Sequence, residues 1–147
     1  MPGADMDLFY DILLWLHIVA FVAGGANTVA MPLIESRLHT AIPETRAVLF
    51  AMAGILARIG RAAMIVLLIT GPVLLVMRYG GVSGASVWFW LKMGLIVVML
   101  VSIVVGGISF KRAQNGDAGA LETASTAGKI TAVAFLGVLL SAVFAFN

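Results

Sequence analysis

The sequence predicts an all-α integral membrane protein, a bundle of four transmembrane helices in a single domain covering residues 1–147. Of its residues 62% are hydrophobic and 11% are charged, and the mean hydropathy is +1.11. Soluble domains are about half apolar and about a quarter charged, so this chain has too few charged side chains to cover a water-exposed surface. The absence of cysteine excludes disulfides, thiolate metal sites and iron–sulfur clusters. The net charge of +2, with scattered basic residues, gives no indication of nucleic acid as a partner.

Four apolar stretches are long enough to cross a bilayer, which takes about 20 apolar residues. The first covers residues 8–33, and Pro32 is expected at its end because helix ends tolerate proline. The second covers residues 47–79 and follows a polar segment, 35–46. The third, 87–110, follows a glycine-rich turn. The fourth, 127–146, follows segment 111–126, which is expected to be a loop because small and polar residues dominate it.

The distribution of lysine and arginine predicts the orientation, because basic loops stay in the cytoplasm. The first and third loops, with the adjoining helix ends, contain most of these residues: Arg37, Arg46, Arg58, Lys111, Arg112 and Lys129. The opposite side carries Arg78 and Lys92. We therefore expect a multi-pass protein of the inner (plasma) membrane, surrounded by the lipid bilayer, with both termini outside the cytoplasm.

His17 lies within the first span, and an ionisable residue at membrane depth is a functional hypothesis by default. Residues four, seven and eleven positions later share its helix face, namely Phe21, Gly24 and Thr28. Glycine there leaves room for a flat ligand near the backbone, such as a haem plane bound through imidazole. The alternative is a histidine that hydrogen-bonds another helix, with the glycines serving helix packing.

Thr70 and Lys92 are expected at a depth similar to that of His17. A rise of about 1.5 Å per residue places His17 roughly 13 Å, Thr70 roughly 12 Å and Lys92 roughly 8 Å below the outer face. Lys92 would then neutralise a haem propionate or another anion. Its alternative role is an interfacial lysine whose amine extends to the lipid headgroups.

Arg58 and Arg61 lie three residues apart and share a helix face near the cytoplasmic side. They are expected to bind lipid phosphate, to set the topology, or to pair with an acid such as Glu35. The charged residues of the first polar segment are otherwise interpreted as a solvated loop: Glu35, Arg37, Glu44 and Arg46. The sequence contains no nucleotide-binding loop, zinc-ligand spacing or serine-nucleophile motif.

A second histidine ligand to the same haem is not expected within one chain. His39 follows His17 by 22 residues, roughly 33 Å along a helix, and lies past the end of the first span. A sixth ligand would come from Lys92, a partner chain or a methionine, or the position would stay open. The methionines within the spans are candidates for haem or Cu(I), although methionine is also a routine apolar filler: Met64, Met77, Met93 and Met99.

Several short motifs, in this order, resemble a small four-helix membrane family. They are Trp15-Leu16-His17-Ile18 with Gly24-Gly25 in the first span, Arg58-Ile59-Gly60-Arg61 leading to Thr70-Gly71 in the second, and Trp90-Leu91-Lys92-Met93 with Phe110-Lys111-Arg112 in the third. The family is that of HemJ, the haem-linked protoporphyrinogen oxidase, together with relatives that carry CopD-like copper-resistance domains. The likeness covers most of the chain.

The resemblance implies a b-type haem with His17 as its ligand. For HemJ it further implies oxidation of protoporphyrinogen, with electrons passing to a membrane acceptor. The CopD-like branch implies copper handling instead. The chain departs from HemJ before the last span, where Leu121-Glu122-Thr123-Ala124 lacks the expected proline, and the arginines and Thr70-Gly71 of the second span look more CopD-like.

Two functions from different classes therefore remain. The first is a haem b protein of redox or electron-transfer function, with His17 as metal ligand and Lys92, Gly24, Thr28, Thr70 and Arg61 around the cofactor. The second is a copper-handling or structural membrane protein without a redox cofactor. Small integral bundles often dimerise, so a homo-oligomer is a further expectation.

Overall fold

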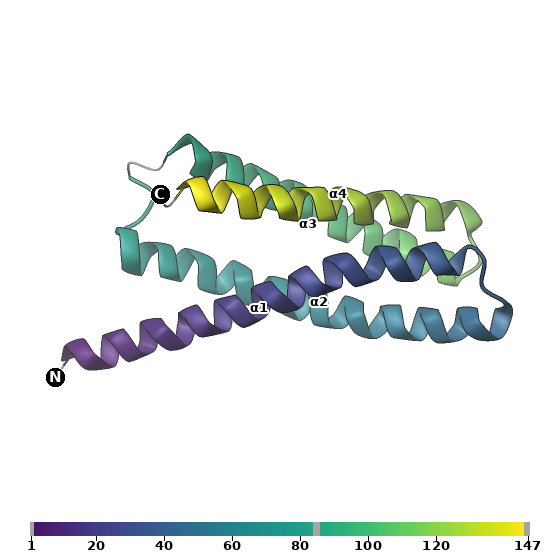
Figure 1. Cartoon of the computed structure of the whole chain (residues 1–147), viewed down its shortest axis with the longest axis horizontal. Helices are drawn as coiled ribbons and strands as arrows, with labels where there is room; N and C mark the ends of the chain where they lie inside the picture. The colour runs from purple at the N-terminus through teal and green to yellow at the C-terminus, as the bar shows by residue number, and fades with distance from the viewer. Residues whose placement is uncertain (1, 84–85, 146–147) are drawn as a thin grey trace. The chain divides into compact units, whose positions relative to one another are not determined.

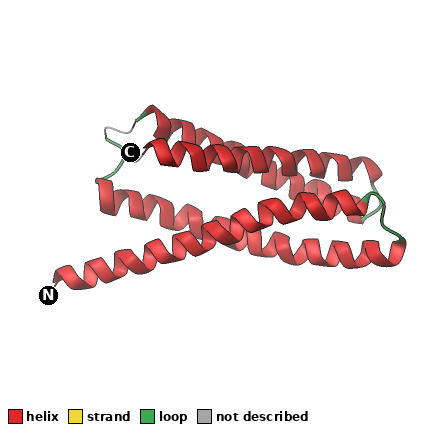
Figure 2. Ribbon diagram, viewed as in Figure 1, coloured by secondary structure: helices red, strands yellow, loops and turns green. Residues whose placement is uncertain are grey.

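The computed structural model describes residues 2–83 and 86–145, which form four α-helices and no strand (Figure 1, Figure 2). The helices are α1 (Pro2–Leu38), α2 (Pro43–Tyr79), α3 (Val87–Gln114) and α4 (Ala118–Ala145). All four are long and apolar enough to cross a membrane. The predicted all-α fold with four transmembrane helices is therefore confirmed.

Large apolar side chains point outward along every helix. Val29, Val87 and Val133 are 66%, 83% and 71% exposed, whereas the buried residues are mostly small, such as Ala53 and Ala124 at 0% and 1%. An outer surface of this kind is favourable against lipid tails and unfavourable against water. Small residues inside are typical of membrane helices, because they let helix backbones approach closely.

α1 continues to Leu38, so Pro32 lies inside the helix, and its expected position at the helix end is wrong. An internal proline removes one backbone hydrogen bond. The helical residues after Pro32 offset this loss, because they place Ile34 and Leu38, 8% and 0% exposed, in a packed core. α2 begins earlier than expected, at Pro43, because a proline at the first helical position lacks only an N–H that would have no partner there.

The loop expected over residues 111–126 is wrong for most of its length, since only 115–117 lie outside α3 and α4. Gly116 adopts φ +99°, which few other residues tolerate, and this reverses the chain within three residues. Asp117 then accepts a hydrogen bond from the Ala120 N–H at 3.2 Å and caps α4. The change from apolar to polar residues predicts where the chain leaves the hydrocarbon layer. α3 and α4 both extend beyond that point into the polar segment.

The residue contacts divide the chain into two compact units, and α1 and α2 contribute to both. The first unit comprises Met1–Asn27 and Arg58–Gly84. Within it the two helices run antiparallel, because later residues of α1 meet earlier residues of α2. His17 meets Thr70, and a Cβ built on Gly24 would lie 4.0 Å from that of Ala63.

The second unit comprises Thr28–Ala57 and Ala85–Asn147, and contains α3 and α4 as an antiparallel pair, visible side by side in Figure 1. The Trp88 and Phe144 rings stack at one end of this pair, with centroids 5.1 Å apart. Towards the other end Gly106 packs against Ala127, so that a Cβ on the glycine would lie 3.2 Å from the alanine Cβ. Small residues thus allow close contact along the pair.

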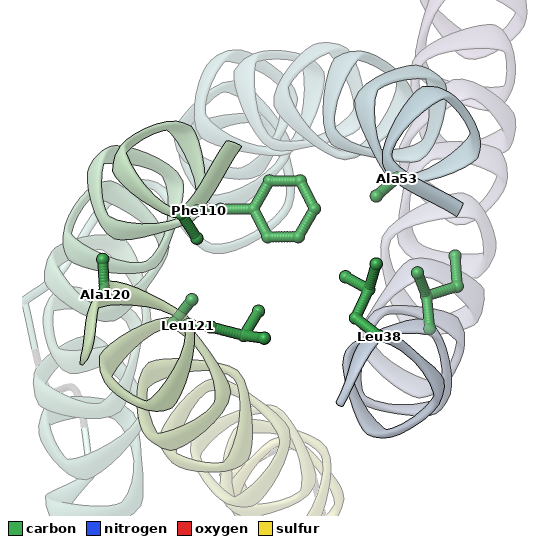
Figure 3. Close-up of a cluster of buried hydrophobic side chains, with 8 residues drawn as sticks. Leu38, Ala53, Phe110, Ala120 and Leu121 are labelled. Carbon is green, nitrogen blue, oxygen red and sulfur yellow. The ribbon is translucent and has the colours of Figure 1, made fainter. Parts of the chain in front are cut away.

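The core of the second unit lies where α3 and α4 meet the ends of α1 and α2. Figure 3 shows Phe110 of α3 and Leu121 of α4 directed towards Leu38 of α1 and Ala53 of α2. The Phe110 ring meets the edge of the Phe50 ring at a centroid distance of 5.3 Å and an interplanar angle of 64°. This geometry is favourable for aromatic pairs.

Candidate functional site

His17 of α1 and Thr70 of α2 form a hydrogen bond within the first unit, with 2.6 Å between Nδ1 and Oγ1. The sequence predicts a similar depth for these two residues, and the structure joins them by a hydrogen bond. Thr70 is 2% exposed, whereas His17 is half-buried. A buried hydroxyl therefore lies against Nδ1 of the imidazole.

The Thr70 hydroxyl fixes the direction of this bond. Its single hydrogen is donated to the Val66 carbonyl at 2.7 Å, four residues earlier on α2. With its hydrogen directed to Val66, Thr70 Oγ1 acts as an acceptor, and we infer that His17 Nδ1–H is the donor. A neutral imidazole with its proton on Nδ1 carries its lone pair on Nε2. Thr70 thereby selects the tautomer in which Nε2 is the basic nitrogen.

Glycines lie close to this histidine on both helices. A Cβ built on Gly71 would lie 3.6 Å from His17 Cε1, which is ordinary van der Waals contact. Gly24, two turns along α1 from His17, is half-buried opposite Ala63. The ring edge therefore lies against bare helix backbone at Gly71, a residue to which the sequence analysis gave no role of its own.

Asn27 and Gly60 make a second close contact between α1 and α2, which was not predicted from the sequence. A side chain at Gly60 would overlap the Asn27 amide, whose Cγ lies 3.2 Å from the Cβ position. Asn27 Oδ1 is buried and accepts no hydrogen bond from the residues that the structure describes. A single asparagine in an apolar helix was the available signal, because such residues commonly face another helix.

The other predicted cofactor residues are divided between the two units. Arg61 belongs to the first unit but is exposed and stands nine residues before Thr70, roughly 13 Å along α2, so it does not join the His17–Thr70 pair. Thr28 and Lys92 belong to the second unit, and both are half-buried. His39 is exposed beyond the end of α1.

Glu35 is buried in α1 and is not part of a solvated loop, so that interpretation is wrong. The residue is 3% exposed, and its carboxylate lies against Gly128 of α4. The error arose because the helix was ended too early. When the helical period continues beyond Pro32, Glu35 falls on the same stripe as Met31 and Leu38, which pack in the core.

A surface pocket of about 460 Å³ lies in the second unit, where the start of α2 meets the turn between α3 and α4. Its lining includes Arg46, Phe50 and Gln114, and the Arg46 guanidinium lies 5.7 Å from the centre of the Phe50 ring. None of the residues predicted for a cofactor lines this pocket. We therefore base the candidate site on His17 and its partner Thr70, and not on this pocket.

Comparison of the chain with protein-family models, with curated proteins and with solved structures finds no match. The resemblance to the HemJ and CopD-like proteins therefore depends on the short motifs quoted above. What can be inferred about function has to come from the residues themselves.

Proposed function

We propose that this chain is an integral membrane protein that binds haem b, with His17 as an axial ligand of the iron. One observation supports this assignment above the others: His17 Nδ1 lies 2.6 Å from Thr70 Oγ1, whose hydroxyl in turn lies 2.7 Å from the Val66 carbonyl, so that Thr70 is placed to accept a hydrogen bond from Nδ1–H. Histidine ligands of metals usually donate their second ring N–H to an oxygen acceptor, which fixes the tautomer and raises the basicity of the ligating nitrogen. His17 and Thr70 form such a pair.

The donor set fits a haem better than a bare metal ion. Among residues 2–83 and 86–145, no three histidine, cysteine, aspartate or glutamate side chains gather where they could hold an ion. A haem needs a single protein ligand, because the porphyrin supplies four nitrogens. One imidazole with a fixed tautomer is sufficient for this cofactor and insufficient for a tetrahedral ion site.

Bound haem would supply one-electron redox chemistry, and the residues of this chain would tune and orient it. His17 would bind the iron through Nε2, and Thr70 would hold the imidazole in one orientation. Gly71 leaves the ring edge close to the helix backbone. From the sequence, Lys92 is the cation that we propose for a propionate, and Gly24 and Thr28 continue the His17 face of α1.

We further propose that the protein lies in the plasma membrane with both termini outside the cytoplasm, which places His17 in the outer half of the bilayer. The likeness to HemJ motifs suggests protoporphyrinogen as the substrate and a membrane component as the electron acceptor. A homo-oligomer would allow a second chain to supply the remaining axial ligand.

A reduced-minus-oxidised absorbance spectrum of the purified protein, supplied with haem, tests the proposal. We expect wild-type protein and His39→Ala to show the bands of a b-type haem, because His39 is exposed outside the helices. We expect His17→Ala to insert into membranes normally and to lose these bands. A wild-type spectrum in His17→Ala contradicts the ligand assignment. A wild-type protein that takes up no haem contradicts the function, and copper binding would then be measured on the same sample.

A further inference from the structure

The carboxyl group of Glu35 lies against the backbone of α4 inside the second unit. A Cβ built on Gly128 would lie 3.2 Å from Glu35 Oε2 and 3.8 Å from Oε1. A side chain at this position would have to displace the carboxyl group by a few tenths of an ångström. α1 and α4 thus enclose the carboxyl group, and the residue is 3% exposed.

Apolar residues surround this acid on both helices. Ile34 and Leu38 on α1, and Ala124 one turn from Gly128 on α4, belong to the buried cluster of Figure 3. Glu35 Oε2 is itself buried and accepts no hydrogen bond from any described residue. A carboxylate without donors is unfavourable in such surroundings, and the neutral acid is favoured.

One cation acts on this carboxyl group, namely Lys129, which follows Gly128 and is exposed. A cation near a carboxyl group favours the ionised form, whereas burial favours the neutral form. The other charged side chains near this end of the unit are exposed or half-exposed: Arg37 on α1, Glu44 and Arg46 on α2, Lys111 and Arg112 on α3, Asp117 in the turn, and Glu122 on α4. Burial and the Lys129 cation therefore act in opposite directions on the Glu35 carboxyl group.

We propose that Glu35 is a proton-binding site within the membrane domain. The carboxylate takes up one proton to give a neutral acid packed against Gly128, and it releases the proton to give an anion attracted by Lys129. A proton suits the site because it needs one carboxyl group, whereas a metal ion would need further ligands that do not gather here among the described residues. Glu35 lies three residues from the end of α1, so the path to water is short.

Infrared spectroscopy of the purified protein in detergent, titrated with acid and base, tests this proposal without any haem. We expect wild-type protein to show the carbonyl stretch of a buried carboxylic acid, gained and lost reversibly as the pH is changed. Glu35→Gln, which keeps the side-chain volume, should lose this band. Glu122→Gln, an exposed acid on α4, should keep it. A titrating band that persists in Glu35→Gln, or the absence of any titrating band in wild-type protein, overturns the proposal.

Two further variants test the geometry. Gly128→Ala should shift the band, because the new methyl group would press on Oε2, whereas Gly107→Ala should not, because no atom lies within 4 Å of its Cβ position. Lys129→Met should enlarge the band at a fixed pH, since the carboxylate loses its attracting cation. An unchanged band in both Gly128→Ala and Lys129→Met overturns the assigned location.

Discussion

Thr70 offers the most direct test of how one residue controls another in this protein. Thr70→Val keeps the shape of the side chain but removes the acceptor for His17 Nδ1–H. Loss of such a partner typically weakens metal-site affinity by about 10–100-fold. We expect this loss in haem affinity, measured by titration with haem, together with a more positive midpoint potential, because a less basic imidazole stabilises oxidised iron less.

Thr70→Ser and Thr131→Val are the matched controls. Serine retains a hydroxyl that can both donate to Val66 and accept from His17, so it should restore most of the affinity and potential. Thr131 of α4 is also buried and donates to the carbonyl four residues earlier, that of Ala127, at 2.9 Å. If Thr131→Val changes the potential as much as Thr70→Val does, the effect is one of general packing and our explanation fails.

The similar depth of His17 and Thr70 could be predicted because the helical rise sets the depth of a residue in a span, whereas their contact also depends on which helix faces meet. Burial of Glu35 could not be predicted once the helix had been ended at its apolar boundary. Which face of a helix is buried depends on its neighbours, so the contact of Asn27 with Gly60 also required the structure. The roles of Lys92 and Arg61 stay predictions, because a cation near a membrane interface fits several functions.

At the scale of the elements, Gly60 decides how closely α1 and α2 approach within the first unit. Gly60→Ala would place a methyl group on the Asn27 amide, and overpacking of this kind typically costs about 1–3 kcal/mol. We expect a lower free energy of unfolding by that amount, measured by denaturant titration in mixed micelles. Asn27→Ala combined with Gly60→Ala should recover part of the loss, because the overlapping amide is then absent.

Gly54→Ala on the same helix is the control, because no atom lies within 4 Å of its Cβ position. Alanine is a better helix former than glycine by up to about 1 kcal/mol, so this variant should be neutral or more stable. Equal destabilisation by both substitutions would mean that the Asn27 contact does not control the packing.

The number and order of the helices followed from hydropathy, because each span needs about 20 apolar residues. Their ends did not follow, since polarity locates the membrane boundary and local capping locates the helix end. Asp117 and Gly116 show the difference: both stand in a polar segment, yet they make a tight turn between two helices that extend past the apolar residues.

At the scale of the whole molecule, the lysine and arginine residues beside the first and third loops predict which side of the membrane each terminus faces. Asn115 lies in the turn between α3 and α4, close to Lys111 and Arg112, whereas Asn147 lies outside the described residues and follows α4. A single span, that of α4, separates the two positions, so they must face opposite sides of the membrane. Basic segments stay in the cytoplasm, and we therefore expect Asn115 inside and Asn147 outside.

Paired reporter fusions at these two positions measure the topology. A reporter that is active only in the cytoplasm should work at Asn115 and fail at Asn147, and a reporter that is active only outside should do the reverse. Both fusions reporting the same side would contradict the four-span fold, because it places one crossing between them. A clean reversal would leave the fold intact but move His17 to the cytoplasmic half of the bilayer. The proposed haem would then exchange electrons on the cytoplasmic side, and Glu35 would take its proton from outside.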